Sequence, residues 1–229
     1  MSEVRENIGR IRERIAAAAL RAGRDPNRVR LMAVTKTVSD ERILAAIEAG
    51  IDIIGENYVQ EAKRKIEGMG KSVEWHLIGH LQTNKAKYAV KLFYLIHSVD
   101  SLELAKEIDK QAAKIGKVQD VLIEVSISGE ASKAGVASEN AAALVKGVAK
   151  LKNISIKGLM TMPPYSDSPE DSRPYFKKLR ELSESVAREN IPGVSMKELS
   201  MGMSGDFEVA IEEGATMVRV GTAIFGERG

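Results

Sequence analysis

The sequence contains no cysteine, so disulfide bonds, thiolate zinc sites and a cysteine nucleophile are all excluded. It also has no excess charge of one sign: 34 lysines and arginines nearly balance 32 aspartates and glutamates, which leaves a net charge of +2 and no general field for nucleic acid. No apolar run approaches the roughly 20 residues of a membrane-spanning helix. The N-terminus (MSEVRENIGR) is charged with both signs, unlike a secretory signal or transit peptide. We expect a cytoplasmic protein that binds neither nucleic acid nor membranes.

The chain has enough apolar material for a large core, because 44% of its 229 residues are hydrophobic. Its 19 glycines and 6 prolines are ordinary, which excludes collagen-like and low-complexity chains. We see no linker, so we expect a single domain over residues 1–229.

An apolar stripe with the 3.6-residue period of a helix begins the chain. Its members are Val4, Ile8, Ile11 and Ile15. Gly23, followed by Asp25 and Pro26, predicts the end of this helix.

Eight short runs rich in β-branched residues follow, and amphipathic stretches separate them. The runs are Arg30–Thr35, Asp52–Gly55, Val73–Ile78, Tyr94–Val99, Gln119–Ser126, Ser155–Thr161, Lys197–Met201 and Thr216–Val220. Strand and helix in alternation favour parallel strands, and eight such units in a chain of this size indicate a (β/α)8 TIM barrel. An open doubly wound sheet is the alternative. Because few residues follow Phe225, we expect the N-terminal helix to cover the wall that a truncated last helix leaves bare.

Several helix starts can be read from their capping residues. Asp100 with Glu103 predicts a capping box, and Asp206 begins a short helix that ends at Gly214. The helix after the sixth run starts ambiguously, because Pro169 and Pro174 could each occupy a first turn.

A barrel carries its site at the carboxyl ends of its strands, where the first run places Lys36. Partial burial there favours the neutral amine that Schiff-base chemistry requires. The alternative is a lysine that extends to solvent at a strand end.

The ends of the last two strands are rich in glycine and hydroxyl groups. Ser200 lies near the end of the seventh run and Ser204 follows it, and Gly221 and Thr222 follow the eighth. Backbone amides in such loops can form a phosphate cradle, although the same residues could simply make tight turns. A lysine opposite a phosphate cradle suits either a phosphosugar aldolase substrate or pyridoxal 5′-phosphate (PLP).

The three histidines lack the spacing of metal ligands, so we predict no metal site. We expect His76 and His97 to be hydrogen-bonded residues of the barrel, whereas His80, beyond a strand end, could contact a cofactor or partner.

Six motifs occur in order along nearly the whole chain, from about Val29 to Gly226. They are Val34–Lys36, Gly55–Glu61, His76–Lys85, Gly158–Met160, Leu199–Ser204 and Arg219–Gly226. Together they strongly resemble the pyridoxal phosphate homeostasis protein family, whose members are alanine-racemase-like barrels.

The resemblance implies one barrel, like the N-terminal barrel of alanine racemase, with PLP held as a Schiff base on Lys36. It places the phosphate at Ser200, Ser204, Gly221 and Thr222 and puts Asn57 near the cofactor. It also implies that Arg219 faces the pyridine nitrogen. An arginine can only donate there, which would weaken PLP as an electron sink. Without the motif, an ion pair from Arg219 to Glu208 or Glu212 would be the simpler interpretation.

The family implies a carrier or regulator in PLP homeostasis, which we expect to be a monomer that serves PLP-dependent apo-enzymes and is not itself an enzyme. A low-activity amino-acid racemase is the alternative, but no part of the chain is left for the extra domain that supplies a second base in alanine racemases. A lysine-imine aldolase would need a partner acid, and Glu124 is the nearby carboxylate we can nominate.

Overall fold

The computed structural model describes residues 2–70, 72–127 and 134–226, and its centre is a closed barrel of parallel strands. The barrel strands are β1 (Arg30–Val34), β2 (Ile53–Glu56), β3 (Glu74–Leu77), β4 (Leu95–Val99), β5 (Gln119–Ser126), β7 (Ile154–Met160), β8 (Val194–Ser200) and β9 (Met217–Val220). Pairing of β1 with β9 and of β4 with β5 closes the ring. The predicted (β/α)8 barrel is therefore confirmed, and the open-sheet alternative is wrong.

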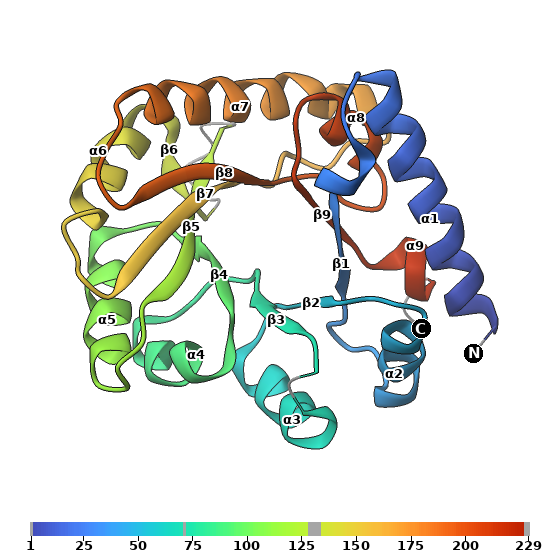
Figure 1. Cartoon of the computed structure of the whole chain (residues 1–229), viewed down its shortest axis with the longest axis horizontal. Helices are drawn as coiled ribbons and strands as arrows, with labels where there is room; N and C mark the ends of the chain where they lie inside the picture. The colour runs from blue at the N-terminus through green and yellow to red at the C-terminus, as the bar shows by residue number, and fades with distance from the viewer. Residues whose placement is uncertain (1, 71, 128–133, 227–229) are drawn as a thin grey trace.

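Helices surround the strands on the outside of the barrel (Figure 1). They are α1 (Ser2–Arg21), α2 (Asp40–Glu48), α3 (Val59–Met69), α4 (Ala86–Leu92), α5 (Leu102–Ala113), α6 (Ser138–Val148), α7 (Arg173–Arg188), α8 (Phe207–Glu212) and α9 (Thr222–Phe225). Short 3-10 turns occupy Pro26–Arg28, Thr83–Lys85 and Pro169–Ser172. Within the described ranges, no helix is both long and apolar enough to span a membrane.

Three local features differ from or refine the sequence prediction. The cap of α5 is Ser101, whose hydroxyl accepts from the Leu104 amide, and not Asp100. Both candidate prolines lie in first turns, because a 3-10 turn begins at Pro169 and α7 follows with Pro174 near its start. A two-residue strand that the sequence did not predict, β6 (Val136–Ala137), pairs with β5.

The hydrophobic core has two parts, as the two faces of a barrel sheet require. The larger part lies between the strands and the surrounding helices. The smaller part fills the barrel interior and consists of Met32, Ile53, Leu95, Leu122, Met160 and Met217. Buried polar side chains share the interior with these residues and lead toward the site described below.

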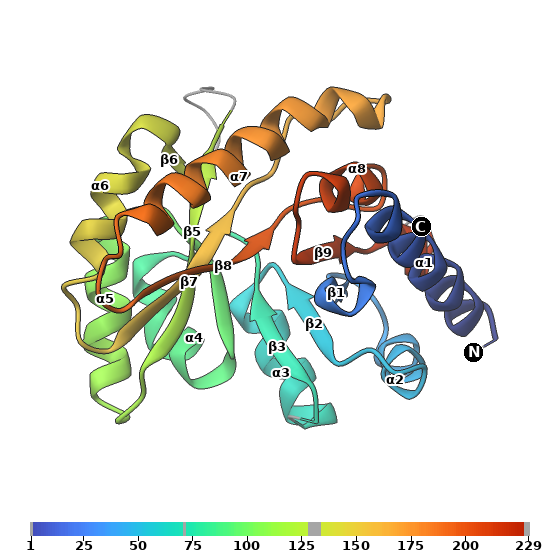
Figure 2. The ribbon, with the colours of Figure 1, turned by 45° about the horizontal axis from the view of Figure 1, so that its top comes forward.

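The N-terminal helix packs beside α8 and α9, where the last helix of the barrel is short (Figures 1 and 2). The predicted apolar stripe is buried, and the Asn7 amide donates to the Ile224 carbonyl at 2.9 Å. Burying each isoleucine of the stripe contributes about 1.5–3 kcal/mol. The expectation that this helix covers the bare wall is confirmed.

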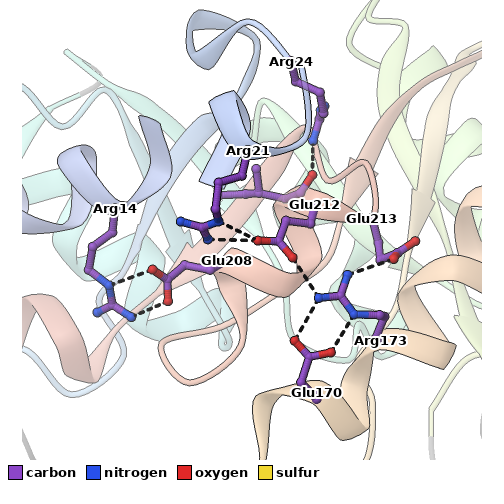
Figure 3. Close-up of polar contacts among 9 residues, drawn as sticks. Arg14, Arg21, Arg24, Glu170, Arg173, Glu208, Glu212 and Glu213 are labelled. Atoms are coloured by element: carbon purple, nitrogen blue, oxygen red, sulfur yellow. Dashed lines mark hydrogen bonds and ion pairs between the residues drawn. The ribbon is translucent and has the colours of Figure 1, made fainter. Parts of the chain in front are cut away.

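Ion pairs join α1, α7 and α8 at the surface (Figure 3). Arg14 and Arg21 of α1 pair with Glu208 and Glu212 of α8 at 2.8 and 2.9 Å, and Arg173 of α7 also reaches Glu212. Exposed pairs of this kind contribute about 0–1 kcal/mol each. The apolar stripe, rather than these ion pairs, therefore holds α1 in place.

Candidate functional site

A cavity of about 440 Å³ opens at the carboxyl end of the barrel, where barrel enzymes carry their sites. Six of the seven predicted site residues line it: Lys36, Asn57, Ser204, Arg219, Gly221 and Thr222. Ser200 does not. Another cavity, of about 480 Å³, lies near the amino ends of β3 and β4, and none of the predicted residues lines it.

Lys36 lies in a turn two residues after the end of β1, and side chains of α3 bind the backbone of its neighbours Thr35 and Thr37. The Lys65 ammonium donates to the Thr35 carbonyl at 2.6 Å, and Glu61 accepts from the Thr37 amide at 2.7 Å. Thr37 has a φ of 63°, a left-handed conformation that is costly for a β-branched residue. These contacts fix the direction in which Lys36 leaves the strand.

The same contacts belong to a buried charged cluster. Lys65 lies 2.7 Å from both Glu56 and Glu61, and the side chains of Lys65 and Glu56 are fully buried. Burial raises the pKa of Glu56, although hydrogen bonds from Lys65 and Thr35 oppose this. This cluster was not predicted from the sequence. The four-residue spacing of Glu61 and Lys65 was its one sequence signal.

Ser204 joins the two predicted loops. Its hydroxyl oxygen accepts from the amides of Gly221 and Ala223 at 3.2 and 3.3 Å, so the loop after β8 is tied to the loop after β9. Gly202 permits the first loop: its φ is 89°, and a Cβ there would lie 2.5 Å from the Ala210 Cβ. The two loops predicted to act together therefore lie together.

Arg219 reaches the cavity from β9 and is almost completely buried, with 3% of its surface exposed. It donates to the Ser200 hydroxyl at 2.8 Å and to the Thr161 carbonyl at 2.9 Å. Burial lowers the pKa of Arg219 to about 10, so the group stays cationic at neutral pH. The simpler ion-pair interpretation is wrong, because Glu208 and Glu212 pair with arginines of α1 and α7.

Ser200 occupies a different place from the one predicted for a phosphate ligand. It is the last residue of β8, is fully buried in the barrel, and its hydroxyl lies 3.0 Å from the His97 Nδ1. A strand alternates its side chains between two faces, and Ser200 points to the inside. Its hydroxyl contacts Arg219 and His97, and Ser200 does not line the cavity.

The histidines lie largely as expected. His76 and His97 are buried and hydrogen-bonded to each other at 3.0 Å, whereas His80 lines the cavity and its Nδ1 lies 3.7 Å from Asp100. Among the residues that the structure describes, no group of three or more His, Asp or Glu side chains is arranged to hold a metal ion.

Glu124 is a further cavity residue, contributed by β5. Burial, reinforced by the charge of Asp100, raises its pKa to about 7, while Arg219 opposes the rise. Its Oε2 atom is buried and makes no hydrogen bond within the described part of the chain. Glu124 can therefore hold a proton near neutral pH and offer it to a bound group.

The elevated pKa of Glu124 predicts a pH-dependent cost to stability. A carboxyl whose pKa rises from 4.5 to about 7 on folding destabilises the fold as pH climbs through that window, by about 3 kcal/mol in total. We expect the free energy of unfolding of Glu124→Gln, relative to that of the parent, to rise by about 2 kcal/mol between pH 5 and pH 8. Denaturant unfolding without added ligand measures this, with Glu103→Gln controlling for loss of an exposed acid. A stability difference that does not change with pH would contradict the assignment.

Known proteins resemble this chain in sequence and in fold. The family model for the N-terminal domain of alanine racemase matches residues 5–229. A pyridoxal phosphate homeostasis protein of Aquifex aeolicus is 51% identical over 97% of both chains. The structure of PipY from Synechococcus elongatus PCC7942, solved with PLP bound, superposes with a TM-score of 0.82 at 36% identity, over 94% of this chain and all of that one.

An alanine racemase of Clostridium difficile superposes over all of this chain and 57% of its own, with a TM-score of 0.76. At 16% identity this match shows the barrel fold alone. The full-length match to a relative at 51% identity shows the family as well as the fold. By its sequence and its barrel, the chain belongs to the pyridoxal phosphate homeostasis protein family.

Proposed function

We propose that this chain binds PLP in the cavity at the carboxyl end of the barrel and takes part in intracellular PLP homeostasis. The observation that carries the proposal is the convergence of an amine (Lys36), a buried guanidinium (Arg219) and two joined hydroxyl-rich loops on one cavity. Its volume lies within the range usual for small-ligand sites. The PLP-bound structure of PipY supports the same ligand.

Lys36 would hold the cofactor covalently. Its Nζ forms a C=N bond with the aldehyde carbon of PLP, and the aldehyde oxygen leaves as water. The turn that carries Lys36 is braced by Lys65 and Glu61, so the amine is presented from a fixed backbone position. When bound, PLP supplies an aldehyde that can be exchanged between amines, which is the chemistry a carrier requires.

The loops after β8 and β9 would hold the phosphate. Ser204 and Thr222 bring hydroxyl groups to the cavity, and Gly221, which has no side chain, lies beside them with its amide donating to the Ser204 hydroxyl oxygen. Asp206 also lines the cavity, but its carboxylate accepts from the Met203 amide and the Ser172 hydroxyl at 2.7 and 2.8 Å. The acid thereby shapes the loop, and the hydroxyl groups face the ligand. We propose that Asn57, at the end of β2, contacts the cofactor from the opposite side.

Arg219 would face the ring nitrogen of PLP. A guanidinium donates and does not accept, so it holds a ring nitrogen without a proton on it. A ring without that proton withdraws electrons weakly, which disfavours chemistry at the α-carbon of an amino acid. We propose that the protein holds and delivers PLP, as a single-domain monomer in the cytoplasm, to PLP-dependent apo-enzymes.

Removing a proposed phosphate contact should lower the affinity for PLP. We expect Thr222→Ala and Ser204→Ala each to weaken PLP binding by about 1–3 kcal/mol, the value of a hydrogen bond to a charged group. Thr222→Ala is the cleaner change, because the Ser204 hydroxyl also ties the two loops together. Absorbance titration measures the affinity, with the exposed Thr83→Ala as control. Equal affinity for PLP and for pyridoxal, which lacks the phosphate, would show that the loops are only turns.

The racemase alternative is tested by exchange at the α-carbon of L-alanine. Glu124 and His80 share the cavity with Lys36, so a second acid or base is within the site. We nevertheless expect little exchange with solvent deuterium, because Arg219 leaves the ring a poor electron sink. Exchange with racemisation at about 1–1000 per second would establish a racemase. Exchange without inversion would indicate Lys36 as a single base and leave the carrier role intact.

A further inference from the structure

A chain of hydrogen bonds crosses the barrel interior and ends at Arg219. Its members, from the amino end of β3 to the cavity, are Glu74, His76, His97, Ser200 and Arg219, and we call it the interior chain. The successive separations are 3.2, 3.0, 3.0 and 2.8 Å. The chain links β3 and β4 to β8 and β9, strands that are far apart in sequence.

The two ends of the interior chain fix the direction of every bond in it. Arg219 can only donate, and an ionised Glu74 can only accept. The hydrogen bond from His76 lowers the pKa of Glu74, which favours the ionised form. Burial lowers the pKa of His76 and of His97, so both rings are neutral and each has one donor and one acceptor nitrogen.

Only one arrangement then satisfies all the groups. Arg219 donates to the Ser200 oxygen, and the Ser200 hydroxyl donates to the His97 Nδ1. The His97 Nε2 proton points to the His76 Nδ1, and the His76 Nε2 proton points to Glu74. Each ring therefore carries its proton on Nε2, and no proton is left without an acceptor.

We infer that the interior chain is a positioning device that fixes the Arg219 guanidinium at the cavity with its charge intact, so that Ser200, His97 and His76 act on the cofactor through Arg219. This inference rests on the proposed function for the identity of the ligand. The buried guanidinium donates to two neutral acceptors, Ser200 and the Thr161 carbonyl. Bonds that all point the same way polarise one another, which makes the Ser200 oxygen a better acceptor for a cation. Ser200 thus has a role distinct from phosphate binding.

The first test measures the protons themselves, in the full-length protein without PLP. Nitrogen-15 NMR of histidine-labelled protein reports which ring nitrogen carries the proton, and His80→Gln identifies the third histidine by its loss. We expect both His76 and His97 to be protonated on Nε2 at neutral pH. A proton on Nδ1 of either ring would overturn the inferred direction.

The second test asks whether the interior chain acts on the ligand. Ser200→Ala should shift the His97 Nδ1 resonance, weaken PLP binding about tenfold or more, and move the absorbance maximum of the bound cofactor. Ser98→Ala is the matched control: its hydroxyl is buried and has no hydrogen-bond partner among the described residues. The control should change none of these readouts. If Ser200→Ala does not fold, Ser200→Cys keeps the volume, weakens the link and takes its place.

The outcomes separate this inference from the proposed function. If the parent protein binds PLP and Ser200→Ala binds it with the same affinity and spectrum, the positioning role is wrong and the proposed function stands. If the parent protein does not bind PLP, both fail. A change in stability alone, with PLP affinity and spectrum unchanged, would also reject the positioning role.

Discussion

Replacing Lys36 with alanine is expected to abolish covalent retention of PLP. The variant keeps the rest of the cavity, so PLP should still bind weakly through its phosphate, but it should be lost on gel filtration. The absorbance of the protein-bound cofactor should disappear, and borohydride should fix no label. The turn around Lys36 is held by backbone contacts to Lys65 and Glu61, so the variant should fold.

An exposed lysine provides the matched control. Lys87→Ala lies on α4, outside the cavity, and should retain the cofactor and its absorbance. Thermal unfolding of both variants checks that loss of PLP is not loss of fold. If Lys36→Ala retained a borohydride-stable label at the level of the parent, the assignment of Lys36 would be wrong.

The second large effect concerns Gly158, where β7 passes close to β8. A Cβ at this position would lie 1.8 Å from the carbonyl oxygen of Glu198, an impossible approach unless the two strands separate. The register of both β5–β7 and β7–β8 shifts beside this residue. We expect Gly158→Ala to destabilise the fold by about 3 kcal/mol or more, because it overpacks a rigid backbone contact.

Denaturant unfolding measures the effect, and Gly68→Ala supplies the contrast. Gly68 lies within α3, and a Cβ there would meet nothing within 4 Å, so alanine should stabilise the helix by about 0.5–1 kcal/mol. Alanine is therefore expected to lower the free energy of unfolding at Gly158 and to raise it at Gly68. A neutral Gly158→Ala would show that β7 and β8 can separate freely.

The barrel could be predicted because its signals are local and repeated. Each buried strand is a short apolar run, and helices carry their own period and start signals, as the apolar stripe of α1 and Asp206 before α8 illustrate. The prediction that the sheet closes into a barrel followed from the number of strand–helix units. The two-residue strand β6 was missed because two residues carry no period.

The cavity residues could be predicted because a barrel gathers the strand ends in one place. Lys36, Asn57 and Thr222 each lie within two residues of the end of a strand, and the structure brings them to one cavity. The sequence did not show whether the last residue of a strand points into the barrel or away from it. Ser200 and Ser204 are similar in sequence context, yet one lies inside the barrel and the other in the loop beyond it.

Long-range partners were also beyond the sequence. Arg219 has Glu208 and Glu212 nearby in the chain, but its hydrogen-bond partners come from β8 and from the end of β7. The contact of His97 with Ser200 joins residues that are 103 positions apart. Such contacts depend on which strands face each other across the closed barrel, which no local pattern encodes.

Borohydride reduction followed by peptide mapping tests whether Lys36 holds PLP covalently. The parent protein is saturated with PLP, reduced with borohydride, digested, and mapped by peptide mass spectrometry. We predict one pyridoxyl group per chain, located on Lys36. A label located on Lys65, Lys85 or another lysine, with Lys36 unmodified, would show that Lys36 does not hold PLP.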